Sequence, residues 1–168
     1  FGKDVVREMN RLGMIVDISH VADKTFWDAL EVSKAPIFAS HSSCRALADA
    51  PRNMTDEMIV ALAKKGGVVQ VNFNCGFVSQ RFRNATAEQQ KTMHASFEEL
   101  LAHIDHIKKI AGVDAIGIGS DFDGVDCVPE QLDDVSKFPN LTRALLERGY
   151  SAMDIRKIYG LNTLRVKI

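Results

Sequence analysis

Two short apolar stretches that each run into a histidine constrain the fold of this chain most strongly. The first reads GMIVDISH and ends at His20, and the second reads APIFASHSS and contains His41. A segment with helical patterning, residues 21–33, separates them. Apolar strands that alternate with helices are typical of a parallel sheet, in which the carboxyl ends of neighbouring strands meet at one edge. The sequence therefore predicts that both histidines face one mouth, where neutral imidazoles bind metal ions.

Either histidine taken alone has an ordinary interpretation. A histidine at the end of a strand commonly hydrogen-bonds a nearby backbone group, and isolated motif matches often mislead. The recurrence of the same arrangement in two consecutive strand-helix units favours the metal-binding interpretation of His20 and His41.

The remainder of the chain continues the alternation of strands and helices. Strands are expected at residues 14–19, 37–40, 68–73 and 115–119. Such strands form either an open doubly wound sheet or part of a (β/α)8 barrel, and a complete barrel takes roughly 250 residues. Four strand-helix units within 168 residues would be half of a barrel. Both ends of the chain lie inside helical patterns, so residues 1–168 are expected to be one partial barrel domain, a fragment of a longer catalytic domain.

Several segments between the strands also carry clear expectations. Asp23 is a candidate N-cap of the helix at residues 21–33. Residues 74–86 have little regular patterning and are expected to form a long loop, whereas residues 87–111 are expected to form a long helix or a helix pair. Two or three helices are expected after residue 137.

Composition excludes several classes of partner. The chain has 21 basic and 22 acidic side chains and a formal net charge of -1, so it has no electrostatic footprint for nucleic acid or for direct membrane contact. Three widely separated cysteines, Cys44, Cys75 and Cys127, form no CxxC pair and no predicted disulfide framework. The odd cysteine count and the lack of a visible signal peptide slightly favour the cytoplasm, and localisation otherwise stays open.

Two further residues are candidates for the same mouth. Asp121 follows the strand at residues 115–119 and could ligate a metal or act as a general base, although a carboxylate that caps a turn is an equal alternative. Arg52 lies in the loop after His41, and its guanidinium could bind a carboxylate in bidentate fashion. Arg45 competes for that role, and a solvated or capping arginine is the ordinary interpretation of either one.

The other candidate ligands have structural interpretations. His94, His103 and His106 fall on a helical pattern without the HExxH arrangement and are expected on a helix surface. Cys44 is expected to be a small buried hydrophobe.

In this order, the segments DISHV, FASHSS, PRNM, VVQVNF, GIGSDFDG and LNTLRV resemble the membrane (renal) dipeptidase family of metallopeptidases. The resemblance covers essentially all of the chain and corresponds to roughly the carboxyl-terminal half of a family member. It implies a (β/α)8 barrel with two zinc ions bridged by a glutamate, and the hydrolysis of dipeptides.

The resemblance also implies residue roles. His20 and His41 match the two histidines that hold one of the zinc ions. Arg52 matches the arginine that receives the terminal carboxylate of the substrate. Asp121 matches the catalytic aspartate that handles protons at the scissile amide, while Asp123 has no matching role.

The HxD pair, the bridging glutamate and a substrate-contacting histidine of the family have no counterpart in this chain. The resemblance therefore implies a zinc dipeptidase with a small dipeptide substrate, of which this chain alone would be inactive. Another amidohydrolase-type enzyme, such as a lactonase or deaminase, and a non-catalytic barrel used for binding are the alternatives. Open strand edges in a half-barrel favour self-association, so a homodimer is also expected.

Overall fold

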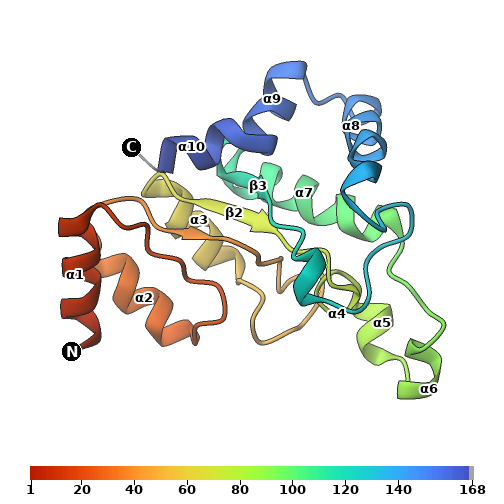
Figure 1. The fold of residues 1–168 in the computed structure, drawn as a ribbon, viewed down its shortest axis with the longest axis horizontal. Coiled ribbons are helices and arrows are strands. Elements are labelled where there is room, and N and C mark those ends of the chain that lie inside the picture. Colours follow the sequence, from red (N-terminus) through yellow and green to blue (C-terminus); the bar gives the residue numbers. More distant parts are fainter. Residues whose placement is uncertain (167–168) are drawn as a thin grey trace.

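The computed structural model describes residues 1–166 and contains a parallel sheet of three strands (Figure 1). The strands are β1 (Phe38–Ala39), β2 (Val68–Val71) and β3 (Ile116–Ile118), in the order β1-β2-β3. Both adjacent pairs run parallel, with Ala39 opposite Val69 and Val69 opposite Ile116. Val69 and Ile116 are fully buried, as expected for a parallel sheet covered by helices. The predicted α/β class is confirmed.

The strand predicted at residues 14–19 is reduced to a single bridge. Asp17 pairs in parallel with Phe38. The backbone N–H of Ile18 donates to the Phe38 carbonyl at 2.9 Å, and the N–H of Phe38 donates to the Val16 carbonyl at 3.1 Å. This segment therefore lies beside β1, as the pattern predicted, but it ends early because the backbone turns at Ser19 and His20.

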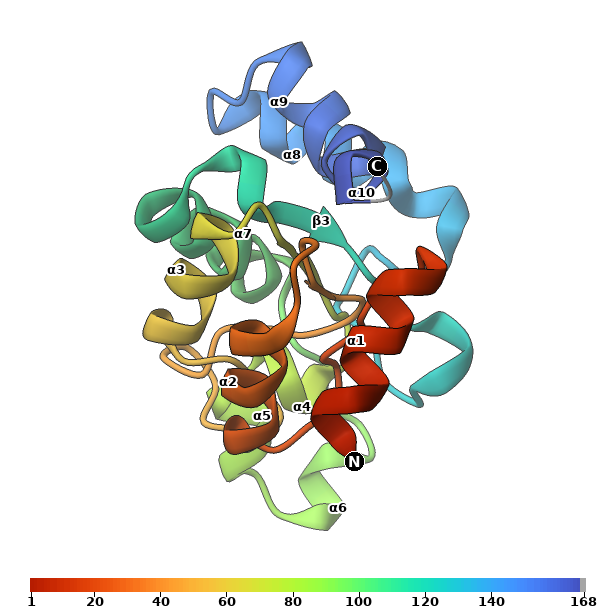
Figure 2. The same cartoon turned by 90° about the vertical axis from the view of Figure 1, so that its left-hand side faces the viewer.

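Helices cover the sheet and extend beyond it, as the two views show (Figures 1 and 2). α1 packs against α2, α3 packs against α7, and the π-helical segment Lys157–Leu161 packs against β3. The longer helices are α1 (Gly2–Leu12), α2 (Asp23–Val32), α3 (Asp56–Lys64), α7 (Phe97–Ala111) and α8 (Phe138–Glu147), followed by the short α9 (Ala152–Arg156) and α10 (Asn162–Val166).

The prediction of a long loop at residues 74–86 is wrong. The structure has α4 (Cys75–Val78) and α5 (Gln80–Asn84) there, followed by α6 (Ala87–Gln90). Asn74 and Ser79 explain the difference, since each side chain accepts a hydrogen bond from a backbone N–H of the helix that follows it. Such caps stabilise helices too short to show an amphipathic period in the sequence. Of the two alternatives expected at residues 87–111, a long helix or a helix pair, the structure has the pair, α6 and α7.

Two further expectations are corrected. Ala22, rather than Asp23, is the N-cap of α2, because the Asp23 carboxylate forms a bidentate ion pair with Arg45 at 2.7 and 2.8 Å. Cys75 and Cys127, which showed no disulfide framework in the sequence, form a disulfide across 52 residues. Disulfides persist in oxidising compartments, so the cysteines no longer favour a reducing one.

Within residues 1–166, no helix combines the length and the apolar character that crossing a bilayer requires.

Candidate metal centre

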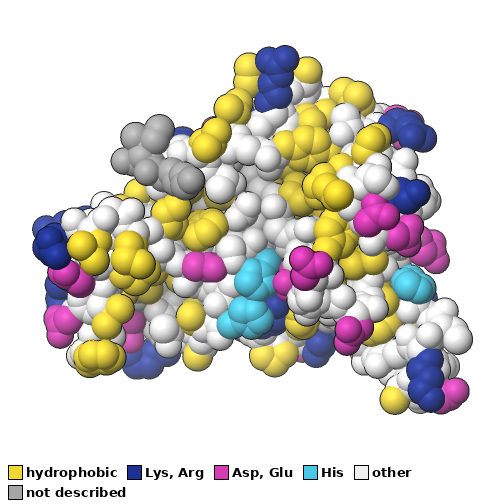
Figure 3. Space-filling view, viewed as in Figure 1, with side chains coloured by type: hydrophobic (Ala, Val, Ile, Leu, Met, Phe, Trp, Pro, Cys, Tyr) yellow, Lys and Arg dark blue, Asp and Glu magenta, His cyan; other side chains and the backbone are white. Residues whose placement is uncertain are grey.

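His20 and His41 come together at the carboxyl edge of the sheet. Their Nε2 atoms lie 2.7 Å apart, and their ring centroids are separated by 4.8 Å. Figure 3 shows histidine side chains gathered near the middle of one face, with acidic and basic side chains beside them. His41 follows β1, and His20 follows the segment that pairs with β1. The convergence predicted from the two apolar runs is therefore present.

A hydrogen-bond chain fixes the tautomer of His41. The hydroxyl of Ser40 donates to Asp17 Oδ2 at 2.5 Å, so its oxygen is left to accept from His41 Nδ1 at 2.7 Å. With its hydrogen on Nδ1, His41 presents the lone pair of Nε2 toward His20. Metal-binding histidines are commonly oriented by such partners on the second ring nitrogen.

Asp17 also joins the two histidine segments. Its Oδ1 accepts from the backbone N–H of Ser19 and of Ser40, both at 3.0 Å. The Ser19 hydroxyl in turn accepts from the backbone N–H of His41 at 3.0 Å. Asp17 and Ser40 were not among the predicted site residues. Their signal was a polar side chain placed inside an apolar run shortly before each histidine.

Asp121 lies beyond the end of β3 and is held by a buried amide. Asn72, which is fully buried, donates from Nδ2 to Asp121 Oδ2 at 3.0 Å. The other carboxylate oxygen lies against Gly124, where an added Cβ would come within 2.2 Å of Oδ1. Only glycine leaves room for this position of the carboxylate. Asn72 is a further residue that sequence reasoning missed, although it is the polar residue of VVQVNF next to the strand end.

Arg52 and Arg45, the two competing arginines, have different environments. Arg45 is occupied by the Asp23 carboxylate and by the carbonyls of Asn53 and Pro51. The guanidinium of Arg52 lies 4.6 Å from the centre of the Phe77 ring, and its Nη2 donates to the His41 carbonyl at 2.5 Å. Its Nε is buried without a hydrogen-bond partner. Arg52 is thus the arginine beside the histidines, and it bonds no carboxylate within the described residues.

Arg52 and Asp121 act on the pKa of His41 in opposite directions. Burial lowers the pKa of His41, the positive charge of Arg52 lowers it further, and the negative charge of Asp121 opposes both. Burial also lowers the pKa of Arg52, against the charges of Asp121 and Asp17. For Asp17, burial raises the pKa, but hydrogen bonds from Ser40 and Ser19 outweigh it and lower the pKa overall. His41, Arg52 and Asp121 therefore share one electrostatic environment with Asp17.

Two of these residues have left-handed backbone conformations. His20 has φ 69° and Asp121 has φ 63°. Histidine and aspartate are among the residues other than glycine that adopt this region most often, and Gln131, outside the site, also has a positive φ of 68°.

The histidine pair fits part of a metal site. Two imidazoles converge, and the hydrogen bond to Ser40 leaves a lone pair on the converging nitrogen of His41. Among residues 1–166, no third His, Cys, Asp or Glu donor joins this pair within 4.8 Å. A catalytic zinc ion normally takes three protein ligands and keeps one open position. His20 and His41 therefore fit two of the ligands of such a site, and the described residues leave the ligand set incomplete.

Of the other histidines, His94 and His103 depart from the expected helix surface, whereas His106 lies on α7 and is partly exposed. His94 lies in the extended segment before α7, where Nδ1 donates to the Val128 carbonyl at 3.0 Å. His103 is fully buried, and His106 is half-buried and contacts Asp56 at 2.8 Å. The expectation for Cys44 is confirmed, because its side chain is fully buried.

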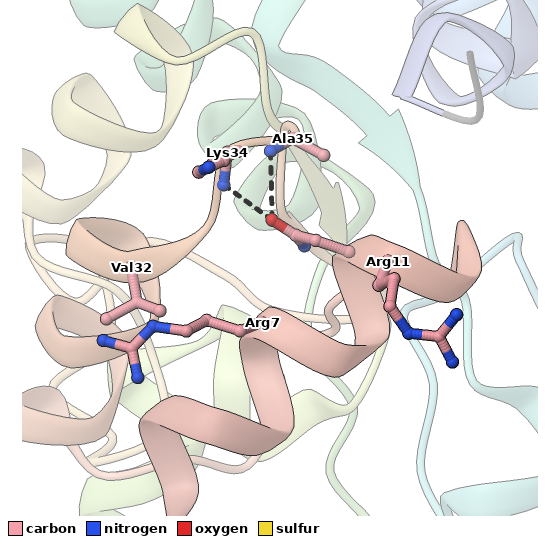
Figure 4. A pocket seen from close by; sticks show the side chains of 6 residues that line it. Arg7, Arg11, Val32, Lys34 and Ala35 are labelled. Atoms are coloured by element: carbon pink, nitrogen blue, oxygen red, sulfur yellow. Dashed lines mark hydrogen bonds between the residues drawn. The ribbon is translucent and has the colours of Figure 1, made fainter.

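The groove of about 510 Å3 between α1 and the end of α2 is a separate feature (Figure 4). Asn10 accepts there from the backbone N–H groups of Lys34 and Ala35, while Arg7 and Arg11 flank it. None of the candidate site residues lines this groove.

Comparison with known proteins gives one consistent family. The chain is 46% identical over 166 residues to an uncharacterised dipeptidase of Schizosaccharomyces pombe, covering 98% of this chain and 38% of that protein. It is 41% identical to the dipeptidase tcpJ of Claviceps purpurea, covering 98% of this chain and 36% of that protein.

A solved structure of a related protein has a fold similar to that of this chain. The crystal structure of a metallopeptidase from Rhodobacter sphaeroides, liganded with a phosphinate mimic of the dipeptide L-Ala-D-Ala, matches with a TM-score of 0.88 and 32% identity. The match covers 99% of this chain and 45% of that one, so the chain spans less than half the length of these relatives. The family model for membrane dipeptidase, peptidase family M19, matches residues 1–167. The chain therefore belongs to the membrane dipeptidase family of metallopeptidases.

Proposed function

We propose that this chain is the carboxyl-terminal half of a zinc-dependent dipeptidase and supplies one side of its active site. The observation that carries the proposal is the 2.7 Å approach of the His20 and His41 Nε2 atoms, with Arg52 hydrogen-bonded to the His41 carbonyl beside them. The coverage of less than half of each relative supports a longer protein around these residues. The family resemblance implies a second zinc ion and further protein ligands. Those ligands have no counterpart in this chain.

His20 and His41 would hold one zinc ion, with Asp17 and Ser40 keeping His41 in the required tautomer. When bound, zinc supplies a Lewis acid for the carbonyl of the scissile amide and makes water nucleophilic near neutral pH. The protein residues orient the substrate and move protons.

Arg52 would bind the terminal carboxylate of a dipeptide. Its guanidinium is positioned by the Phe77 ring and the His41 carbonyl, and its Nε–H group has no hydrogen-bond partner among the described residues. A buried arginine with free donors favours bidentate recognition of a carboxylate. The phosphinate dipeptide mimic bound to the Rhodobacter relative supports a small dipeptide as the substrate class.

Asp121 would pass a proton to the amine that leaves when the amide bond breaks. Its Oδ2 is tied to Asn72, whereas Oδ1 has no hydrogen-bond partner within the described residues. A carboxylate held by one oxygen keeps the other available to take up and release a proton.

Hydrolysis assays on the full-length protein test this function. Dipeptides are expected to be cleaved, whereas lactones and nucleosides are not. Cleavage of lactones or nucleosides alone would instead indicate another amidohydrolase-type enzyme, and no turnover of any substrate would favour a non-catalytic barrel.

Arg52→Ala tests the assigned substrate orientation. We expect KM to rise for free dipeptides and to change less for dipeptide amides, which lack the terminal carboxylate. Arg45→Ala is the matched control, because Arg45 is occupied by Asp23. An equal rise in KM for both substrates would contradict the role of Arg52.

A further inference from the structure

A second cluster of metal-binding donors lies outside the histidine pair. Cys75 is the first residue of α4, His94 lies between α6 and α7, and Cys127 lies in the loop after β3. Their donor atoms all lie within 4.8 Å of one another, the one such group of three among residues 1–166. In the structure the two cysteines form a disulfide, with His94 Nδ1 3.7 Å from Cys127 Sγ.

The partial exposure of Cys127 gives a reductant a route to the disulfide. Cys75 is fully buried, but Cys127 is partly exposed and His94 is exposed. A dithiol reductant can attack Cys127 Sγ and release Cys75 as a thiolate. Its second thiol then resolves the mixed disulfide, so that the reductant leaves oxidised and both cysteines end reduced.

We propose that, once reduced, Cys75, Cys127 and His94 form a binding site for zinc or a similar thiophilic divalent metal. Two thiolates and one imidazole match the donor set of tetrahedral zinc sites with an open fourth position. Metal binding displaces the two thiol protons. Coordination through His94 Nδ1 moves its hydrogen to Nε2 and replaces the bond to the Val128 carbonyl.

Backbone contacts keep the three segments together without the disulfide. The N–H of Cys75 donates to the Cys127 carbonyl at 3.0 Å, and the N–H of Glu130 donates to the Ala95 carbonyl at 3.0 Å. The N–H of Ala95 also donates to Cys75 Sγ at 3.3 Å. A hydrogen bond to sulfur favours its charged form and therefore the thiolate that binds metal.

The site shares no ligand with the His20–His41 pair, and it acts on a neighbouring loop. Cys127 lies six positions after Asp121 in the loop that Asn72 also contacts. The disulfide in the oxidised chain and the metal in the reduced chain would each join this loop to α4. Asp121 is thereby anchored in both redox states.

Cobalt titration tests the site, because thiolate ligands give Co2+ a near-ultraviolet charge-transfer absorption that imidazole and carboxylate ligands do not. Cobalt added to the oxidised chain is expected to give no such band. After reduction and removal of the reductant, the band should grow to saturation with one equivalent at the thiolates. Cys44→Ala is the control and should retain the band, whereas Cys127→Ser should lose it.

His94→Gln separates the proposed imidazole ligand from a site made by two thiolates alone. We expect its Co2+ dissociation constant to rise more than about tenfold, since even second-shell changes have effects of this size. An unchanged constant would overturn the three-residue site. Loss of the band in Cys44→Ala, or its full retention in Cys127→Ser, would overturn it as well.

Circular dichroism covers the case in which reduction alters the fold. If the reduced chain loses helical signal, Co2+ is expected to restore it, because metal that binds the folded state stabilises it. A reduced chain that shows no charge-transfer band, whether it stays folded or fails to refold with Co2+, contradicts the proposal.

Discussion

At the scale of single residues, the orientations of two candidate site residues, His41 and Asp121, depend on a short polar side chain beside each. Ser40 links the Asp17 carboxylate to the His41 ring through two hydrogen bonds, and Asn72 donates a hydrogen bond to the Asp121 carboxylate. These partners form hydrogen bonds that define one orientation of the ring or carboxylate. Loss of a partner is therefore expected to affect the site without removing a ligand or a proton carrier.

Ser40→Ala tests the tautomer of His41. Without the hydroxyl, nothing holds the hydrogen on Nδ1, and zinc affinity of the full-length protein is expected to fall about 10- to 100-fold. Zinc binding is measured by competition with a chromophoric chelator, with Ser136→Ala, at a position outside the site, as the control. Unchanged affinity would show that Ser40 does not orient the ring.

Asp121→Asn tests the proton-transfer role. Asparagine preserves the shape but cannot carry a proton, so turnover of dipeptides is expected to fall about 10²- to 10⁴-fold. Zinc content, measured by elemental analysis, should stay unchanged. Asp123→Asn is the matched control and should have little effect on turnover. Loss of zinc in Asp121→Asn would instead make Asp121 a ligand.

At the scale of secondary-structure elements, α7 carries a buried histidine that links it to two other segments. His103 Nδ1 accepts from the backbone N–H of Cys44 at 3.0 Å, so its Nε2 donates to the Val78 carbonyl at 3.1 Å. Protonation would direct a second N–H at the Cys44 donor. Burial lowers the pKa of His103 to about 4, despite the bond to Val78, which raises it.

The stability of the chain should therefore depend on pH through His103. Its pKa in the folded state lies below the value of 6.5 for an unperturbed side chain, so the unfolded chain binds the proton more readily. The free energy of unfolding is expected to fall as pH decreases from about 6.5 to about 4. Urea denaturation measures it, and His103→Gln should flatten the slope in this range. An identical slope in both proteins would contradict the prediction.

The elements show which contacts a sequence can predict. The apolar runs before His20 and His41 placed both histidines correctly because strand ends follow from a local pattern. The Cys75–Cys127 disulfide and the burial of His103 depend on segments far apart in the chain, and no local pattern reports them. Asp23 likewise is of a residue type that commonly caps helices, but its carboxylate forms an ion pair with Arg45, which is distant in the sequence.

At the scale of the whole molecule, the fold class and the family could be predicted, because the motifs are specific and occur in order. The roles of His20, His41, Arg52 and Asp121 stay predictions, since they depend on ligands that these residues do not include. The chain also exposes several large apolar side chains on α1 and near its carboxyl end, namely Val5, Leu12, Tyr159, Leu161 and Leu164. Figure 3 shows a broad apolar area over α8 to α10.

These 168 residues alone are expected to be inactive and to self-associate. Two imidazoles make an incomplete zinc site, and the exposed apolar side chains promote association. Dipeptide assays with added zinc and sedimentation velocity measure the two properties. Dipeptide hydrolysis by the isolated chain would contradict the first expectation, and a monomeric profile would contradict the second.

Gly119 lies directly after β3, and a Cβ added there would come within 2.0 Å of the Ser40 carbonyl oxygen and 3.0 Å of the His41 Cα. The main chains after two non-adjacent strands therefore meet at this point, and the Gln70 Cβ also lies 3.0 Å from the added atom. Two of these three contacts are backbone atoms, which cannot rotate away from an added side chain. A residue larger than glycine at position 119 is accordingly expected to displace the segment that carries His41.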